Sequence, residues 1–151
     1  MAYKYRYGYE EEKTPPLPKL EKRSFVKFLI LHILTLGLYS IIFFIPLSYD
    51  INKIAPRHGN KTMNFLLASL LAIPTSNIIM IYWFYQITDH IEEALDRRKI
   101  DYDFNKNHFW GWYFLGSFVF IGFYVYVYKL IRAMNLLAAD YNERPHLDEF
   151  R

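Results

Sequence analysis

The sequence predicts an all-α integral membrane protein built from three repeated helical units. Long apolar blocks at 25–47, 64–87 and 108–131 alternate with short, heavily charged segments. Aromatic residues make up 20% of the chain and gather near the block ends, where Tyr and Trp favour the membrane–water boundary. Each block leads into a short stretch with the apolar spacing of an amphipathic helix.

The first block, 25–47, has the composition and the length of a membrane span. It contains no acidic residue, and its single lysine, Lys27, lies near its start. At about 1.5 Å per residue the block is roughly 34 Å long, enough to cross a hydrocarbon core of about 30 Å. Gly37 lies near its middle, where glycine permits a bend or a close helix contact.

The other two blocks are also interrupted near the middle. The break in 64–87 is residues 74–77, a proline followed by three polar residues, and the break in 108–131 is Gly122. We therefore expect three copies of one unit: an apolar half-helix, a breaker, an aromatic half-helix and an amphipathic exit. The amphipathic exits are predicted at 47–55, 87–96 and 130–141.

The remaining segments are polar tails around this membrane domain of 25–141. Residues 1–24 carry alternating tyrosines, a run of three glutamates and three prolines, a composition that favours a flexible tail beside the headgroups. Residues 142–151 form a polar C-terminal tail. The net charge of +3 suits anionic lipid headgroups and does not indicate nucleic acid as a partner. The absence of cysteine excludes disulfides and thiolate chemistry.

The segment Thr35-Leu36-Gly37-Leu38-Tyr39, followed by aromatic residues and then Asp50-Ile51-Asn52, resembles a known family. It is similar to the small prokaryotic membrane proteins grouped as domain of unknown function 4234. Their hallmark is a Thr-x-Gly-Ile-Tyr segment that runs into Tyr/Trp-rich sequence and a polar helix. Gly122-Phe123-Tyr124 resembles a weaker second copy, whereas the middle unit has Asn77-Ile78-Ile79 at this place. The resemblance implies no activity and no functional residue.

Two arrangements of the units in a membrane are compatible with the sequence. In the first, which the block lengths favour, each block crosses the bilayer once, as a straight or kinked helix. Ten lysines and arginines then face seven across the membrane, which places the N-terminus in the cytoplasm of a multi-pass inner-membrane protein. In the second, each unit folds back at its breaker as a re-entrant hairpin, and all exits share the cytoplasmic side.

The candidate sites do not indicate an enzyme, because no nucleophile–base pair, phosphate loop or metal-spaced cluster occurs. His32, His90 and His108 lie toward one face of a three-crossing model, but their depths differ, so we expect neither a metal nor a cofactor. His32 and Asn77 are candidates for a polar path through the membrane. That path would make the protein a small transporter or channel subunit that acts as an oligomer.

Our leading expectation is a non-enzymatic structural or interaction component of the membrane. Its amphipathic helices would engage anionic headgroups or a partner membrane protein, and it would self-associate through small residues. The residues expected at headgroups are Arg97, Arg98, Lys99, Lys129 and Arg132. Those expected in helix packing are Gly37, Gly111, Gly116 and Gly122.

Overall fold

A computed structural model of the chain describes residues 19–54 and 61–145, and this part is helical, with no strand. The predicted all-α class is confirmed. The helices are α1 (Phe25–Leu34), α2 (Tyr39–Ile54), α3 (Phe65–Ala72), α4 (Ile78–Arg98), α5 (Lys106–His108) and α6 (Ile121–Glu143). Between α5 and α6 the chain forms a π-helical turn, η1 (Phe109–Leu115), and a short 3₁₀ helix, η2 (Gly116–Val119).

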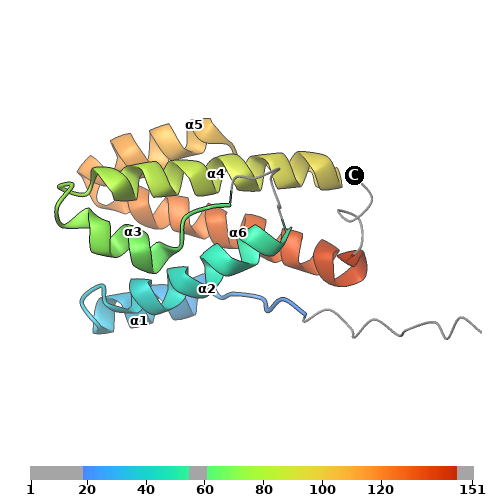
Figure 1. Ribbon diagram of the computed structural model, residues 1–151, viewed down its shortest axis with the longest axis horizontal. Coiled ribbons are helices and arrows are strands. Elements are labelled where there is room, and N and C mark those ends of the chain that lie inside the picture. The colour runs from blue at the N-terminus through green and yellow to red at the C-terminus, as the bar shows by residue number, and fades with distance from the viewer. Residues whose placement is uncertain (1–18, 55–60, 146–151) are drawn as a thin grey trace, which may run out of the picture.

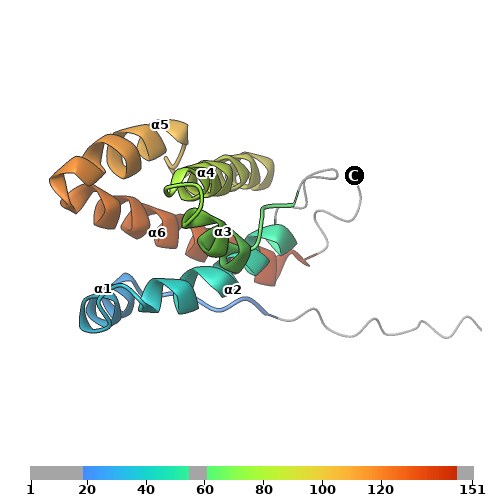
Figure 2. The same cartoon turned by 60° about the vertical axis from the view of Figure 1, so that its left-hand side comes forward.

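The three apolar blocks are hairpins rather than single helices. The chain reverses between α1 and α2, between α3 and α4, and between η2 and α6. All three reversals lie at the same end of the molecule, on the left of Figure 1, and the turned view in Figure 2 keeps them together. The single helices expected over 25–47, 64–87 and 108–131 are therefore each divided, because the chain folds back inside every block. In the described ranges, no helix combines the length and the apolar character that a membrane crossing requires.

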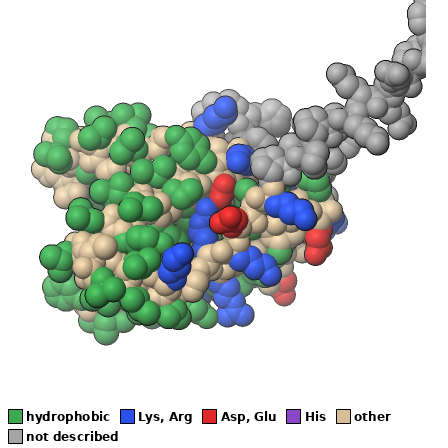
Figure 3. Space-filling view, turned by 90° about the horizontal axis from the view of Figure 1, so that it is seen from below, with side chains coloured by type: hydrophobic (Ala, Val, Ile, Leu, Met, Phe, Trp, Pro, Cys, Tyr) green, Lys and Arg blue, Asp and Glu red, His purple; other side chains and the backbone are tan. Residues whose placement is uncertain are grey.

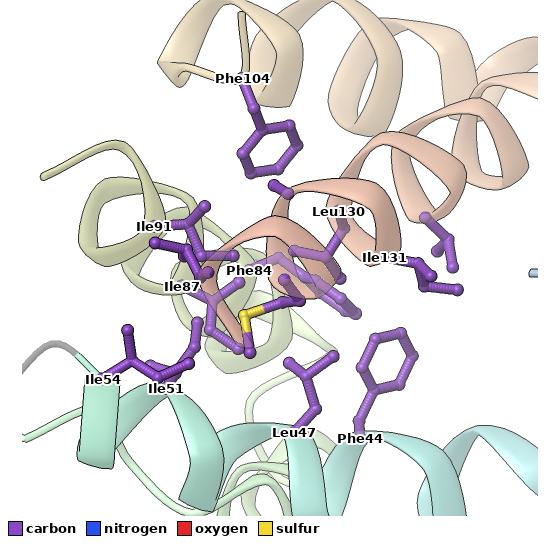
Figure 4. Close-up of a cluster of buried hydrophobic side chains, with 14 of the residues drawn as sticks. Phe44, Leu47, Ile51, Ile54, Phe84, Ile87, Ile91, Phe104, Leu130 and Ile131 are labelled. Atoms are coloured by element: carbon purple, nitrogen blue, oxygen red, sulfur yellow. The ribbon is translucent and has the colours of Figure 1, made fainter. Parts of the chain in front are cut away.

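The predicted amphipathic exits are the far halves of α2, α4 and α6. Their apolar faces do not lie on a surface, because they pack against one another in one buried core (Figure 4). Each exit contributes side chains to this core that are at most 3% exposed. The core residues of the exits are Leu47, Ile51 and Ile54 in α2, Ile87 and Ile91 in α4, and Leu130, Met134 and Leu137 in α6.

The segment before α1 is held on the last helix by two asparagine side chains. The Asn135 amide accepts from the Arg23 backbone N–H and donates to the Arg23 carbonyl, both at 2.7 Å. Asn142 binds the backbone of Leu20 in the same way, at 2.8 and 2.9 Å. Two helical turns between the asparagines cover roughly 10 Å, as do three extended residues. Residues 19–24 are therefore fixed in place, unlike the flexible tail we expected; residues 1–18 lie outside the described chain.

In the other two units, the equivalent residue of the exit helix also binds the backbone of a lead-in segment. Asn52 in α2 and Glu92 in α4 occupy the place that Asn135 has in α6, counted from the first buried exit residue. Asn52 binds the backbone N–H and carbonyl of Thr62 at 2.8 and 3.0 Å. The Glu92 carboxylate accepts from the backbone N–H of Lys106 at 3.2 Å. Each exit helix thus holds the segment that leads into the next hairpin, and the last exit helix holds the first such segment.

Candidate functional site: the apolar end and its charged border

The first reversal is built around a threonine hydroxyl and a glycine. Thr35 Oγ1 donates to the Leu31 carbonyl at 2.7 Å and accepts from the Tyr39 backbone N–H at 2.9 Å, so it connects the two arms. Gly37 has a φ of 94°, a left-handed conformation that glycine adopts without steric cost. Its N–H donates to the His32 carbonyl at 2.8 Å. The backbone N–H groups of residues 35–39 therefore all have partners within the hairpin.

The second reversal has the same construction with different residues. Thr75 Oγ1 donates to the Leu71 carbonyl at 2.6 Å and accepts from the Ile79 N–H at 3.5 Å. Asn77 takes the place of the glycine with a φ of 66°, and its N–H donates to the Ala72 carbonyl at 2.8 Å. Asparagine tolerates this conformation better than most residues with a side chain. The middle unit therefore keeps the turn although its sequence departs from the Gly-x-Tyr pattern.

The third reversal is built differently. Ser117 Oγ donates to the Tyr113 carbonyl, as the two threonines do in their arms, but the left-handed residue is Phe120, with a φ of 60°. The turn thus ends before Gly122, the predicted breaker, which lies inside α6. The sequence interpretation failed here because glycine can mark a turn or a close contact, and Gly122 serves the second purpose.

Gly116 and Gly122 pack the two arms of the third hairpin against each other. A Cβ atom on Gly122 would lie 2.2 Å from the carbonyl carbon of Gly116, closer than real atoms approach. The pair that we expected between separate copies is therefore used within one chain. Gly111 differs, because a Cβ there would have nothing within 4 Å.

The three reversals present exposed hydrophobic side chains, which define the apolar end of the molecule. Leu36, Ile73 and Phe120 are 95%, 86% and 84% exposed. The adjoining parts of the arms add further exposed residues: Leu34, Leu38, Ile42, Leu70, Ile78, Leu115, Phe118, Val119 and Ile121. On the face in Figure 3, hydrophobic side chains cover one half and charged side chains lie in the other. A continuous apolar surface of this kind indicates a binding or membrane-contact surface.

Charged residues of the opposite half form ion pairs between segments far apart in sequence. The Arg23 guanidinium pairs with Asp50, and Lys106 Nζ lies 2.7 Å from an Asp89 carboxylate oxygen. Arg98 Nη1 donates to Asp140 at 2.6 Å, with its own side chain only 1% exposed. These pairs hold the lead-in segments and the exit helices together.

The residues expected at lipid headgroups lie in several different environments. Arg98 is buried in its pair with Asp140, while Arg97 is half-buried beside it. Lys129 Nζ donates to His108 Nε2 at 2.9 Å. Lys99 is exposed at the end of α4, and the exposed Arg132 lies over the Tyr102 ring at 5.7 Å. Lys99 and Arg132 are thus the two of the five that the structure leaves at the surface.

The candidates for a polar path are not brought together. His32 Nδ1 lies 2.7 Å from Ser40 Oγ across the first hairpin, and its ring stacks on Phe28. Asn77 belongs to the turn of the second hairpin. The ring neighbours of His32 are instead Phe28 in its own hairpin and Phe123 and Tyr124 of α6. His90 bonds Thr62 and His108 bonds Lys129, so the three histidines have separate partners.

Residues 23–93 match the family model of a domain of unknown function, DUF4234. The chain carries a DUF4234 domain. The DUF4234 match covers the first hairpin, the second hairpin and most of α4. The hallmark Thr35-Leu36-Gly37-Leu38-Tyr39 is the turn of the first DUF4234 hairpin, which explains its threonine and its glycine physically. Comparison with curated proteins and with solved structures finds no match.

Proposed function

We propose that this DUF4234 protein is a non-enzymatic membrane protein whose apolar end inserts into one leaflet. Its three charged helix ends then stay in water on the same side, where they contact headgroups or a partner protein. The observation that carries this proposal is the position of all three apolar reversals at one end, opposite the charged residues (Figures 1 and 3).

The size of the hairpins supports insertion to the depth of one leaflet. Helix α1 has 10 residues and is therefore about 15 Å long, half of a hydrocarbon core of about 30 Å. In two of the turns, Thr35 and Thr75 also pair backbone groups of both arms, which supports a position in lipid, where water cannot pair them. Trp110, Trp112 and Tyr128 are exposed on the arms of the third hairpin, several residues from its Phe120 tip, and such amphipathic rings favour the membrane–water boundary.

The distribution of basic residues supports the same placement. Every segment that flanks a block carries lysine or arginine, which fits poorly with segments on opposite sides of a membrane. In the one-leaflet arrangement all these segments share one side. We assign that side to the cytoplasm, and the membrane to the inner membrane, because positively charged flanks stay there.

Cysteine accessibility tests the proposal cleanly, because the chain has no cysteine of its own. Lys61→Cys, Asp101→Cys and Glu143→Cys place one thiol after each unit. In sealed vesicles, a membrane-impermeant maleimide should label all three from the same side. Leu36→Cys, Ile73→Cys and Phe120→Cys should resist this reagent from both sides and react with a lipid-soluble maleimide.

Two other results would each exclude one-leaflet insertion. Labelling of Lys61→Cys and Asp101→Cys from opposite sides would indicate helices that cross. Free labelling of the three tip variants by the impermeant reagent would indicate that the apolar end is not in lipid.

A further inference from the structure

A pocket of about 220 Å³ lies where the lead-in to the first hairpin meets the middle of α2. One wall comes from residues 21–24 and the start of α1, and the other from Tyr39, Ile42, Phe43 and Pro46 of α2. The pocket therefore lies between the apolar end, to which Ile42 belongs, and the charged half, to which the Arg23–Asp50 pair belongs.

The two walls of this pocket differ in chemistry. Lys22 and Lys27 are both exposed and lie on the lead-in wall. Arg23 on the same wall is paired with Asp50, so its charge is compensated, and Glu21 is the one acidic residue among the pocket's described lining. The pocket thus carries an excess of one positive charge. The α2 wall is mainly apolar, and Ile42 is 67% exposed on it.

We propose that this pocket binds one anionic phospholipid. Lys22 and Lys27 contact its phosphate, and an acyl chain lies along Ile42 and Pro46 toward the apolar end. A cationic wall beside an apolar wall fits a ligand whose charge and hydrocarbon are joined, because a free phosphate would use only the first wall. The excess positive charge favours an anionic lipid over a zwitterionic one. This inference rests on the proposed function, since insertion into a leaflet brings lipid to the pocket.

Calorimetric titration of the full chain in a neutral detergent tests the pocket. The probes are dioctanoyl phosphatidylglycerol, dioctanoyl phosphatidylcholine and glycerol 3-phosphate, which has the headgroup charge without acyl chains. Phosphatidylglycerol should bind the tightest of the three. The Lys22→Gln/Lys27→Gln variant should lose roughly fivefold in affinity for each lysine removed, so that the two lipids bind alike.

A matched variant controls for the general effect of charge. Lys53→Gln/Lys61→Gln removes two exposed lysines outside the pocket and should leave phosphatidylglycerol binding unchanged. The Ile42→Asn variant should weaken both lipids, because it makes the apolar wall polar. Circular dichroism of each variant confirms that its helices are intact.

Three outcomes would overturn the proposed lipid site. They are equal binding of both lipids by the unmodified chain, equal losses of phosphatidylglycerol affinity in the two double variants, and binding of glycerol 3-phosphate as tight as that of phosphatidylglycerol. Each of them leaves the cysteine test of leaflet insertion unaffected. Conversely, free aqueous labelling of the hairpin tips would overturn insertion, whereas the lysine-dependent lipid affinity in detergent would still be measurable.

Discussion

Single residues at the turns carry much of the information that makes this chain fold back. Gly37 and Asn77 both adopt left-handed backbone conformations, with φ values of 94° and 66°. Most residues with a Cβ atom pay roughly 1–2 kcal/mol for this conformation, and asparagine is one of the few that adopts it readily. Glycine and asparagine therefore meet the same requirement for a left-handed residue in the turn. Their side chains are too different for the sequence alone to show this equivalence.

Substitution of Gly37 tests this equivalence. Gly37→Ala should lower the free energy of unfolding by roughly 1–2 kcal/mol through backbone strain, because the added Cβ would meet only His32, at an ordinary 3.6 Å. Gly37→Asn should cost less than Gly37→Ala. Thermal unfolding of both variants in one detergent measures the difference. Equal stability of Gly37→Ala and the unmodified chain would contradict a strained turn.

At the scale of the elements, the two arms of the third hairpin depend on contact between two glycines. From the sequence we expected Gly116 and Gly122 to pack helices of separate copies, since small residues permit close approach. The sequence could not indicate which helices, because both positions lie in one apolar block and their contact exists only after the chain reverses near Phe120.

Adding a methyl group at Gly122 should therefore separate these arms. Gly122→Ala places an atom 2.2 Å from the Gly116 backbone, which cannot move aside as a side chain would. We expect a loss of roughly 3 kcal/mol in the free energy of unfolding, or failure to fold. Gly111→Ala is the matched control, since its Cβ meets open space and should change stability little. Similar melting temperatures for the two variants would refute the close contact.

The lead-in segments are a second feature of this scale. Asn135→Leu removes the partners of both backbone groups of Arg23, which should cost roughly 1–3 kcal/mol because these groups are left partly buried and unpaired. Amide hydrogen exchange should accelerate at Leu20 and Arg23. Asn107→Leu, at an exposed position of α5, should leave this exchange unchanged. Unaltered exchange in Asn135→Leu would show that the asparagine does not hold the segment.

For the whole molecule, the buried pair of Arg98 and Asp140 joins the ends of α4 and α6. Burial raises the pKa of Asp140, but hydrogen bonds from Arg144 and Arg98 outweigh it and hold the pKa below the usual value. A carboxyl group with a lowered folded-state pKa contributes stability above its unfolded-state pKa. This contribution is therefore present at neutral pH and is lost as the pH falls below about 4.

Substitution of Arg98 should reveal this dependence of stability on pH. Arg98→Met leaves Asp140 with the half-exposed Arg144 as its remaining partner and should cost roughly 3 kcal/mol at neutral pH, with a smaller loss below about pH 4, where the carboxyl group is protonated. Arg132→Met removes an exposed arginine and should have little effect. Denaturant titration at several pH values measures both. A loss that is the same at every pH would argue against the ion pair as its cause.

Much of the repeated plan could be predicted from sequence, including two of the three breakers and the helical exits. The reversals could not, because a block such as 25–47 has the length of a crossing whether or not it turns at Gly37. The role of the exits was also hidden. An amphipathic pattern reveals that Leu47 and Ile51 face something apolar, but not that the other two exits provide it. Arg98 was expected at headgroups for the same reason, since its partner Asp140 is 42 residues away.

The contact of Asn135 and Asn142 with the first lead-in segment has a consequence for how the three units are related. In a linear repeat protein the first and last copies each lack a neighbour and need caps. Here the last exit helix holds the first segment, so every unit has a neighbour on both sides and the array closes on itself. No unit is a terminal copy in the packing, although the chain itself has two termini. A circular permutant that joins the present ends and opens between two other units would therefore have the same neighbours throughout.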